Sequence, residues 1–236
     1  EPALALFAAE LPAALALADS ADLFRDYARL AGPLRAISDE TSAAAPQRSR
    51  ALWMLALLAW RGNRGADGDA AHRVFESLAG HAGSLGALLG VVAGPGMHHL
   101  PAAALRRAPA LVDHDSANGT GDPFYRTLLY LSRAEWQLAA QNPEQAVREL
   151  RWHENNDFVG YPGIEPQAGD VDYALGTLAR WRRARLLESF GSAYRDETCA
   201  SYTAVARNWR EGDARFAARA DSAAQRLRAL GCPAAR

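Results

Sequence analysis

Residues 130–150 read YLSRAEWQLAAQNPEQAVREL, two amphipathic segments that meet at an Asn–Pro pair. On each side of the pair, apolar residues recur every three or four positions, which is helical spacing. Asn142 followed by Pro143 is a helix-start signal, because asparagine caps a first turn and proline is preset for the first helical position. Two helices joined by so short a turn run antiparallel. The stretch therefore predicts a helical hairpin formed by residues 124–140 and 144–153.

The composition of the whole chain also favours helices over sheets. Its 236 residues include 52 Ala but only 2 Ile and 8 Val. Alanine is the best helix former, whereas a pleated sheet needs β-branched side chains to fill its surface. We therefore expect an all-α protein. All 26 basic residues are Arg, which indicates a GC-rich bacterial genome and carries no information about function.

In the N-terminal part, residues 1–121, a helix that opens at Asp19 or Ser20 is expected to end at Gly32–Pro33, because proline lacks a backbone donor. A strongly apolar helix at 46–61 and a second helix at 69–78, separated by the loop GNRGADGD, form a loose hairpin across 46–79. The stretch that follows, to residue 121, is rich in Gly and Pro and is predicted to be a connector.

In the C-terminal part, residues 122–236, a 17-residue loop at 154–170 follows the first hairpin. The helices expected beyond it are at 171–190, 197–210 and 214–230. Asp213 is a capping residue at the start of the last helix, and Gly231 ends it.

The first hairpin resembles a tetratricopeptide repeat, in which a small residue and a larger apolar one, four positions apart, follow an aromatic first helix. Tyr130 and Ala134 stand in the first helix, and Ala146 and Leu150 in the second. The resemblance implies an irregular stack of antiparallel helical hairpins, an α-solenoid of TPR-like type, with 214–230 as a C-terminal capping helix. The looser matches are Leu55, Leu58, Ala71 and Phe75 in one hairpin and Ala200, Ala204 and Trp209 in another.

The spacing of these matches is irregular. Ala71, Ala146 and Ala200 are 75 and 54 residues apart, which are not multiples of the repeat length of about 34. The segments RWHENNDFVGYPG and VDYALGTLARWRRARLLESFG are also similar to the C-terminal helical-repeat regions of multidomain regulators, including serine/threonine kinases, of GC-rich bacteria. That resemblance covers residues 122–232 and implies a non-catalytic protein-interaction or sensor module.

Net charge, hydropathy and the absence of known motifs exclude several classes of function. The formal net charge is −1, so nucleic acid is not an expected partner. The longest apolar run, residues 51–60, is shorter than the ~18 residues of a membrane span, so any membrane association would run through a partner. No Walker, GxSxG, dinucleotide or kinase motif is present, so we expect no enzyme activity and no cofactor.

The expected partner is a protein or peptide, and no feature indicates an oligomeric state. One alternative function is an accessory subunit docked on a larger, possibly membrane-bound, complex, which a broad exposed apolar patch would favour.

The 154–170 loop is the first candidate contact surface. Phe158 and Tyr161 are aromatic anchors of the kind that interfaces favour, with Glu154 and Asp157 beside them. The alternative is that both aromatic rings pack between neighbouring hairpins and that the two carboxylates bind local backbone amides.

Arg182 and Arg183, in the segment ARWRRAR, are the second candidate surface. Clustered arginines can bind phosphate or an acidic partner. Because the arginines of this segment spread over more than one helix face, the alternative is a solvated face of ion pairs.

A metal-dependent enzyme is the other alternative. His98 and His99, together with His114 and Asp115, offer nitrogen and carboxylate ligands if the connector folds them together. Adjacent histidines rarely bind one ion, and neither HExxH nor CxxC is present, so solvated loop residues are the competing interpretation.

Cys199 and Cys232 are the chain's two cysteines. In an antiparallel helix pair, position 199 faces about position 224, so a disulfide requires the chain after Gly231 to fold back. A disulfide would favour an extracytoplasmic, periplasmic location over the cytoplasm. Without it, Cys199 is an ordinary small core residue.

Overall fold

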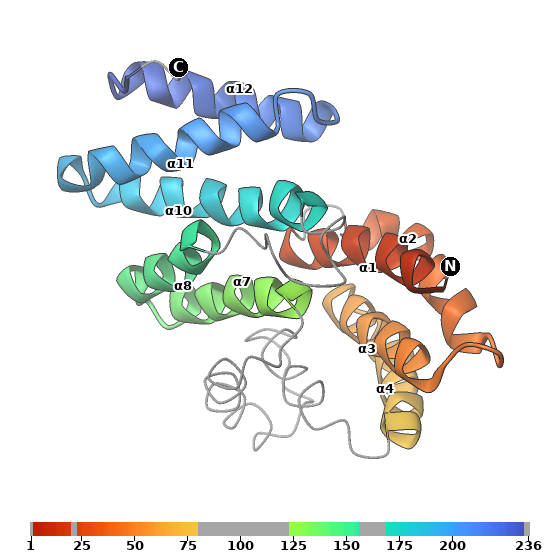
Figure 1. Cartoon of the computed structure of the whole chain (residues 1–236). Helices are drawn as coiled ribbons and strands as arrows, with labels where there is room; N and C mark the ends of the chain where they lie inside the picture. The colour runs from red at the N-terminus through yellow and green to blue at the C-terminus, as the bar shows by residue number, and fades with distance from the viewer. Residues whose placement is uncertain (1, 20–22, 80–122, 156–168, 234–236) are drawn as a thin grey trace. The chain divides into compact units, whose positions relative to one another are not determined.

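The computed structural model describes residues 2–19, 23–79, 123–155 and 169–233. Every element in these ranges is helical, and the ranges contain no β-strand (Figure 1). The prediction of an all-α protein is therefore confirmed. The chain divides into two compact units, unit 1 (residues 1–132) and unit 2 (residues 133–236). The division falls inside a helix rather than after residue 121.

Unit 1 is built around the helix α3 (Ala45–Arg61), which is apolar on every side over residues 51–60. The ten consecutive residues from Ala51 to Trp60 are all buried. A helix that is apolar on every side must be surrounded, and α3 packs against three neighbours. These neighbours are α1 (Pro2–Ala18), α2 (Leu23–Asp39) and α4 (Gly65–Ala79).

The helix end predicted at Gly32–Pro33 is wrong, because α2 continues through both residues to Asp39. Leu30 and Leu34 belong to a buried stripe that runs past the proline. Pro33 itself lies on the exposed side of the helix. The carbonyl that loses its partner is on Arg29, also exposed, so water can satisfy it.

The predicted loop GNRGADGD is mostly helical, because α4 begins at Gly65. A tight turn at Asn63, with φ of 58°, ends α3. Gly68 then lies under the ring of Trp60, where a Cβ atom would be 2.3 Å from the ring carbon Cδ1. The Trp60 indole N–H donates to Asp69 Oδ1 at 3.0 Å. Gly68 and Asp69 thus contribute to the packing of α4 against α3 and do not form a loop.

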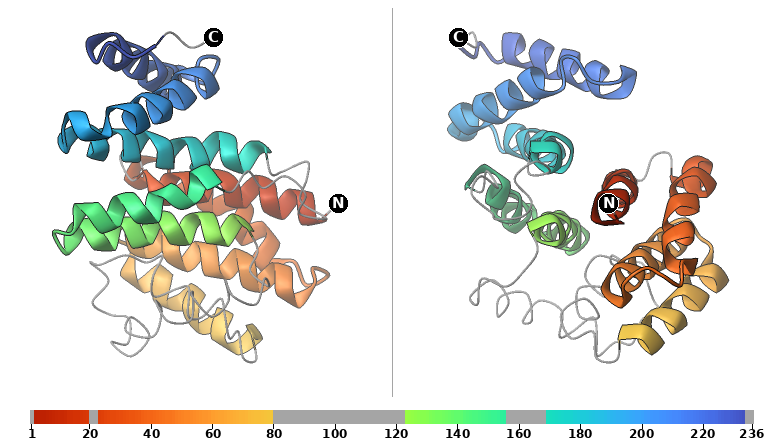
Figure 2. Two further views of the ribbon diagram at one scale, coloured as in Figure 1. Left: turned by 60° about the vertical axis from the view of Figure 1, so that its left-hand side comes forward. Right: turned by 45° about the vertical axis from the view of Figure 1, so that its right-hand side comes forward.

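Unit 2 is a succession of neighbouring helices. After the end of α7 (Pro123–Ala139), α8 (Pro143–Asn155) packs against α10 (Thr177–Ser189), α10 against α11 (Arg195–Asn208), and α11 against α12 (Ala214–Ala229). Figure 2 shows α10, α11 and α12 following one another in space as they do in sequence. The prediction of three successive helices after residue 170 is confirmed.

The turn between α7 and α8 has the predicted form. Gln141 takes a left-handed φ of 58°, and Asn142 Oδ1 accepts from the Gln145 N–H at 3.4 Å. The chain then enters α8 at Pro143. Arg133 and Glu149 join the two helices by an ion pair of 2.9 Å (Nε to Oε2).

The small residues predicted at helix contacts differ in burial. Ala146 is fully buried and Ala71 is partly buried, but Ala200 is exposed. The interpretation of Ala200 as a contact residue is therefore wrong. The residues on either side of Ala200, Cys199 and Ser201, are the small residues that this part of α11 buries.

The helix predicted at 171–190 contains a π-helical turn, η2 (Asp172–Gly176). Side chains at the start of α10 and just after the end of α11 bind two of its carbonyls. Trp209 donates from Nε1 to the Tyr173 carbonyl at 2.8 Å. Thr177 Oγ1 donates to the Asp172 carbonyl at 3.1 Å and accepts from Asn208 Nδ2 at 2.9 Å. Neighbouring side chains thus bind the carbonyls of Asp172 and Tyr173 in the wide turn.

In the ranges that the structure describes, none of the helices combines the length and apolar character needed to cross a bilayer.

Candidate functional site

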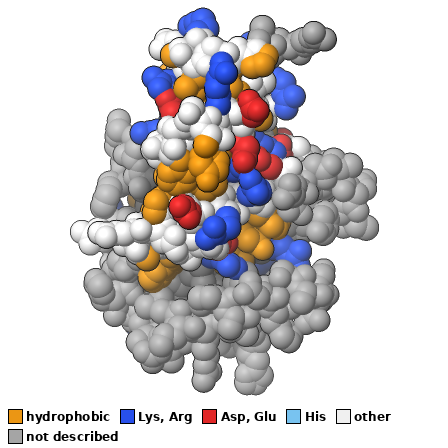
Figure 3. Space-filling model, turned by 90° about the vertical axis from the view of Figure 1, so that its left-hand side faces the viewer, with side chains coloured by type: hydrophobic (Ala, Val, Ile, Leu, Met, Phe, Trp, Pro, Cys, Tyr) orange, Lys and Arg blue, Asp and Glu red, His pale blue; other side chains and the backbone are white. Residues whose placement is uncertain are grey.

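A groove of about 420 Å³ lies between the second half of α7, α8 and α10. Its floor is apolar, and its Leu138 is a large apolar side chain with 41% of its surface exposed. Figure 3 views the side of unit 2 on which α10 ends, where hydrophobic side chains gather between basic and acidic ones. We call this the α7/α10 groove. Its lining residues are Ala134, Glu135, Leu138, Leu150, Arg182, Arg185, Leu186 and Ser189.

The rim of the α7/α10 groove is charged. Arg182 of α10 and Glu135 of α7 face each other across it, with 3.3 Å between Nη1 and Oε1. Arg185, one turn further along α10, is exposed and lies 5.8 Å from the Trp181 ring centroid. Among the described residues no carboxylate pairs with Arg185. The groove thus combines an apolar floor with one unneutralised cation.

Arg183, predicted as part of a contact surface, is instead buried, with 1% of its side chain exposed. Its Nη1 donates to Glu154 at 2.5 Å and to Ser201 Oγ at 3.2 Å, and its Nη2 donates to Glu197. Ser201 Oγ also donates to Glu154 at 2.8 Å. Arg183 cannot contact a partner directly, and it ties α8, α10 and α11 together. We call these four residues the Arg183 network.

At the outer edge of this network, Glu197 accepts a second hydrogen bond, from Arg151 at 2.6 Å. That bond and the charges of Arg183 and Arg151 lower the pKa of the Glu197 carboxyl despite partial desolvation. The same bond raises the pKa of Arg151. Glu197 is therefore ionised and holds two arginines from two other helices.

His153 lies beside the network and is fully buried, in edge-on contact with Trp152 at 5.0 Å between ring centroids. Neither ring nitrogen has a hydrogen-bond partner in the described part of the chain. Burial, with a smaller contribution from the positive charge of Arg180, lowers its pKa to about 3. The imidazole is therefore neutral and suits neither proton transfer nor surface recognition. Arg180 links the His153 carbonyl, at 2.9 Å, to the Asp172 carboxylate, at 2.8 Å.

Several predicted site residues lie outside the described residues. These are Asp157, Phe158 and Tyr161 of the loop and the metal candidates His98, His99, His114 and Asp115. Within the described ranges, no three His, Cys, Asp or Glu side chains gather into a metal site. Of the predicted contact residues, the structure pairs Glu154 with Arg183, whereas Arg182 pairs with Glu135 of α7.

Cys199 of α11 and Cys232, just after α12, form a disulfide with 5.7 Å between the Cα atoms. The chain folds back as the bond requires, because Gly231 adopts a left-handed φ of 62°. The N–H of Cys232 donates to the Leu227 carbonyl at 2.9 Å and that of Gly231 to Arg228 at 3.1 Å, the pattern of a Schellman motif.

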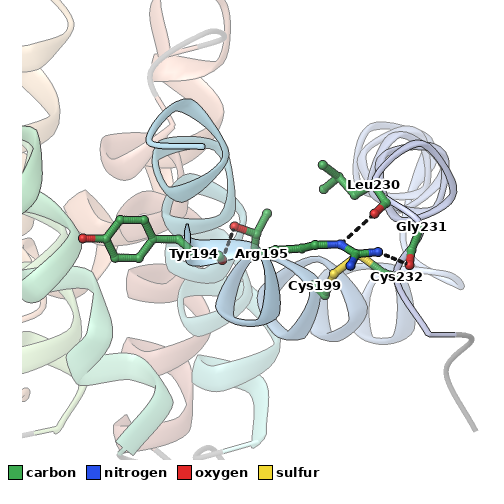
Figure 4. Close-up of a disulfide and its surroundings, with 7 residues drawn as sticks. Tyr194, Arg195, Cys199, Leu230, Gly231 and Cys232 are labelled. Atoms are coloured by element: carbon green, nitrogen blue, oxygen red, sulfur yellow. Dashed lines mark hydrogen bonds between the residues drawn. A yellow bond between two sulfur atoms is a disulfide. The ribbon is translucent and has the colours of Figure 1, made fainter. Parts of the chain in front are cut away.

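Arg195 completes this end of α12. It donates from Nε to the Leu230 carbonyl at 2.9 Å and from Nη2 to the Gly231 carbonyl at 2.5 Å (Figure 4). A cation at these carbonyls neutralises the negative end of the helix dipole. We call Arg195, Cys199, Leu230, Gly231 and Cys232 the C-terminal latch.

Sequence reasoning missed the burial of Arg183 and the role of Arg195. The first had a signal, because Ala179, Arg183 and Leu187 recur every four residues along one buried stripe. The second had none, because Arg195 lies 35 residues from Leu230 in the chain.

Comparisons with models of protein families, with curated proteins and with solved structures give no match to this chain.

Proposed function

We propose that the protein is a non-catalytic interaction module whose unit 2 is a TPR-like stack of helical hairpins. In this proposal the α7/α10 groove receives a segment of a partner protein. The main observation in its support is that one groove contains both an exposed apolar side chain, Leu138, and a cation without a carboxylate partner, Arg185.

The packing of the first hairpin supports the repeat assignment. Ala134 and Ala146 are 1% and 0% exposed, and Leu150 is 1% exposed. These are positions at which a tetratricopeptide unit needs small or apolar residues for close helix contact. The groove lies beside the first helices of two successive hairpins, α7 and α10, so a bound segment would contact both.

The chemistry of the groove specifies the partner segment. Its floor of Ala134, Leu138, Leu150 and Leu186 takes an apolar side chain, whose burial is worth about 1.5–3 kcal/mol. Arg182 is already paired with Glu135, so Arg185 is left to bind a carboxylate. The expected ligand is a short segment with an apolar residue next to Asp or Glu.

Selection from a display library of random short peptides on the full chain tests this. We expect enriched peptides that carry Leu, Ile, Met or Phe beside an acidic residue. The variants Leu138→Asp and Arg185→Glu should weaken their binding about tenfold or more, because each opposes one half of the recognition.

The matched controls carry the same changes elsewhere. Arg210→Glu alters an exposed arginine of unit 2 outside the groove, and Val74→Asp alters an exposed apolar residue of unit 1. Both should bind selected peptides like the parent chain. Selection without enrichment, or equal binding by groove and control variants, would contradict the proposal.

The disulfide supports a further part of the proposal, a location in an oxidising compartment outside the cytoplasm. Alkylation of the protein in freshly lysed producing cells, with a thiol reagent that adds mass, tests this. Full protection of both cysteines before reduction is expected, and rapid labelling without reductant would place the protein in a reducing compartment.

A further inference from the structure

We propose that the C-terminal latch is a redox-operated device that holds α12 on α11, and that a dithiol reductant opens it. When the latch is open, α12 comes away and uncovers Trp209, while α10 and α11 stay packed. This inference is independent of the α7/α10 groove, because no residue of the latch lines it.

The apolar contact of α12 with the rest of unit 2 is small. Only Ala220 and Ala223 are fully buried in this helix, and both are minimal side chains. The larger Phe216 and Leu227 are only partly buried. Since burial stabilises in proportion to apolar area, α12 gains less from packing than α3 or α10 does.

A covalent restraint and two hydrogen bonds act on the C-terminal end of α12. The disulfide ties Cys232 to α11, and Arg195 binds the carbonyls of Leu230 and Gly231 (Figure 4). The bond closes a loop across a sequence separation of 33 residues, which contains most of α11 and all of α12. Cutting the bond leaves, at this end, the two hydrogen bonds from the exposed Arg195 and the ion pair of Arg226 with Glu188 of α10, in which Arg226 is half exposed.

The helix itself does not depend on the latch. At its first turn, Asp213 Oδ1 accepts from the N–H groups of Arg215, at 3.1 Å, and Phe216, at 3.2 Å. At its last turn, the Schellman bonds lie within the chain segment 227–232. Reduction therefore releases α12 from α11 but leaves in place the capping interactions that stabilise the helix itself.

The two cysteine residues differ in exposure, and we infer the order of the chemistry from this difference. Cys232 is partly exposed, whereas Cys199 is 7% exposed. A thiolate of the dithiol bonds to Cys232 Sγ, and Cys199 leaves as the thiolate and takes up a proton. The second thiol of the reductant then displaces Cys232. The products are two cysteine thiols and the cyclic disulfide of the reductant.

The surface that α12 covers includes Trp209, which is 0% exposed. Its ring lies 4.8 Å from that of Phe216 and 5.9 Å from the guanidinium of Arg219, both on α12. Its indole N–H is bound to the Tyr173 carbonyl in η2. Trp209 therefore stays in place when α12 leaves, and one face of its ring becomes accessible.

Amide hydrogen exchange on the full chain, with and without dithiothreitol, tests the latch. We expect amide protection in α12 to fall on the order of 100-fold on reduction, the constraint that such a disulfide supplies, and protection in α10 and α11 to stay within about threefold. Unchanged protection in α12 would overturn the proposal. An equal loss across α10, α11 and α12 would also overturn it, because the bond would then stabilise unit 2 as a whole.

Single substitutions provide a second readout. Cys232→Ser should reproduce the exchange pattern of the reduced chain and no longer respond to dithiothreitol. Arg195→Gln should lower α12 protection further when the bond is reduced, whereas Arg210→Gln, at the exposed end of the α11–α12 turn, should change nothing. A Cys232→Ser chain with the protection of the oxidised protein would contradict the proposal.

Discussion

Arg183 on α10 and Glu154 on α8 form an ion pair of 2.5 Å in which the arginine side chain is 1% exposed and the glutamate side chain 29%. The pair is asymmetric, because the guanidinium of Arg183 is buried whereas the carboxylate of Glu154 remains in contact with solvent. A buried cation is tolerable only while its partners remain, so Arg183 fixes which faces of α8, α10 and α11 meet.

Replacing Arg183 by Met removes the cation and leaves the carboxylates of Glu154 and Glu197 facing each other. We expect the free energy of unfolding to fall by about 1–3 kcal/mol, less than for a fully buried pair, because both carboxylates reach water. Urea unfolding followed by circular dichroism measures it. Arg210→Met is the matched control and should stay within about 0.5 kcal/mol of the parent chain. An Arg183→Met chain as stable as this control would show that the network adds nothing to stability.

The buried His153 predicts a pH dependence of stability. Its pKa is lowered from 6.5 to about 3 in the folded chain, so between these values the unfolded chain binds a proton that the folded chain does not. The free energy of unfolding should therefore fall by about 1.4 kcal/mol per pH unit as the pH drops below 6.5.

Unfolding by urea across this pH window compares the parent chain with His153→Leu. The leucine variant should lose that part of the slope and should gain in stability relative to the parent as the pH falls. His72→Gln, which changes a partly exposed histidine of unit 1, serves as the control and should keep the slope. A parental slope in His153→Leu would mean that His153 is protonated in the folded chain.

Two glycines of α4 predict opposite effects of the same change. At Gly68 an added Cβ would be 2.3 Å from Trp60 Cδ1, whereas at Gly65 nothing lies within 4 Å. Gly68→Ala must displace a buried indole and should lower stability by about 1–3 kcal/mol. Gly65→Ala should raise it by about 0.4–1 kcal/mol, because alanine restricts the unfolded chain. Differential scanning calorimetry of both variants measures the pair, and equal effects would contradict the packing of Trp60 on α4.

Local physical rules predicted the parts of the fold that depend on neighbouring residues. The Asn142–Pro143 helix start and the cap at Asp213 appear as expected. The apolar run in α3 is buried throughout because no face of that helix can meet water favourably. The all-α class follows from the same scarcity of β-branched residues.

The failures occurred where distant residues override a local preference. Pro33 is a helix breaker in isolation, but the buried stripe of α2 continues past it. Gly68 is a loop residue by propensity, but a helix accommodates it because Trp60 needs the space. Whether Cys232 could reach Cys199 depended on the backbone conformation of Gly231, which helix spacing alone does not supply.

Because of the π-helical turn η2, the side chains at the two ends of the helix 171–189 follow two different rotational registers. Such a turn accommodates one residue more than an α-helical turn, which rotates the side chains before it by about 100° relative to those after it. At the start of the turn, the hydroxyl of Tyr173 lies next to Gly212. After the turn, Arg180 and Arg183 point into the interior of unit 2. A single residue deleted between 172 and 176 would merge the registers and move Tyr173 away from the indole of Trp209. The count of residues in this turn, rather than their identity, therefore sets how the two ends of the helix are oriented.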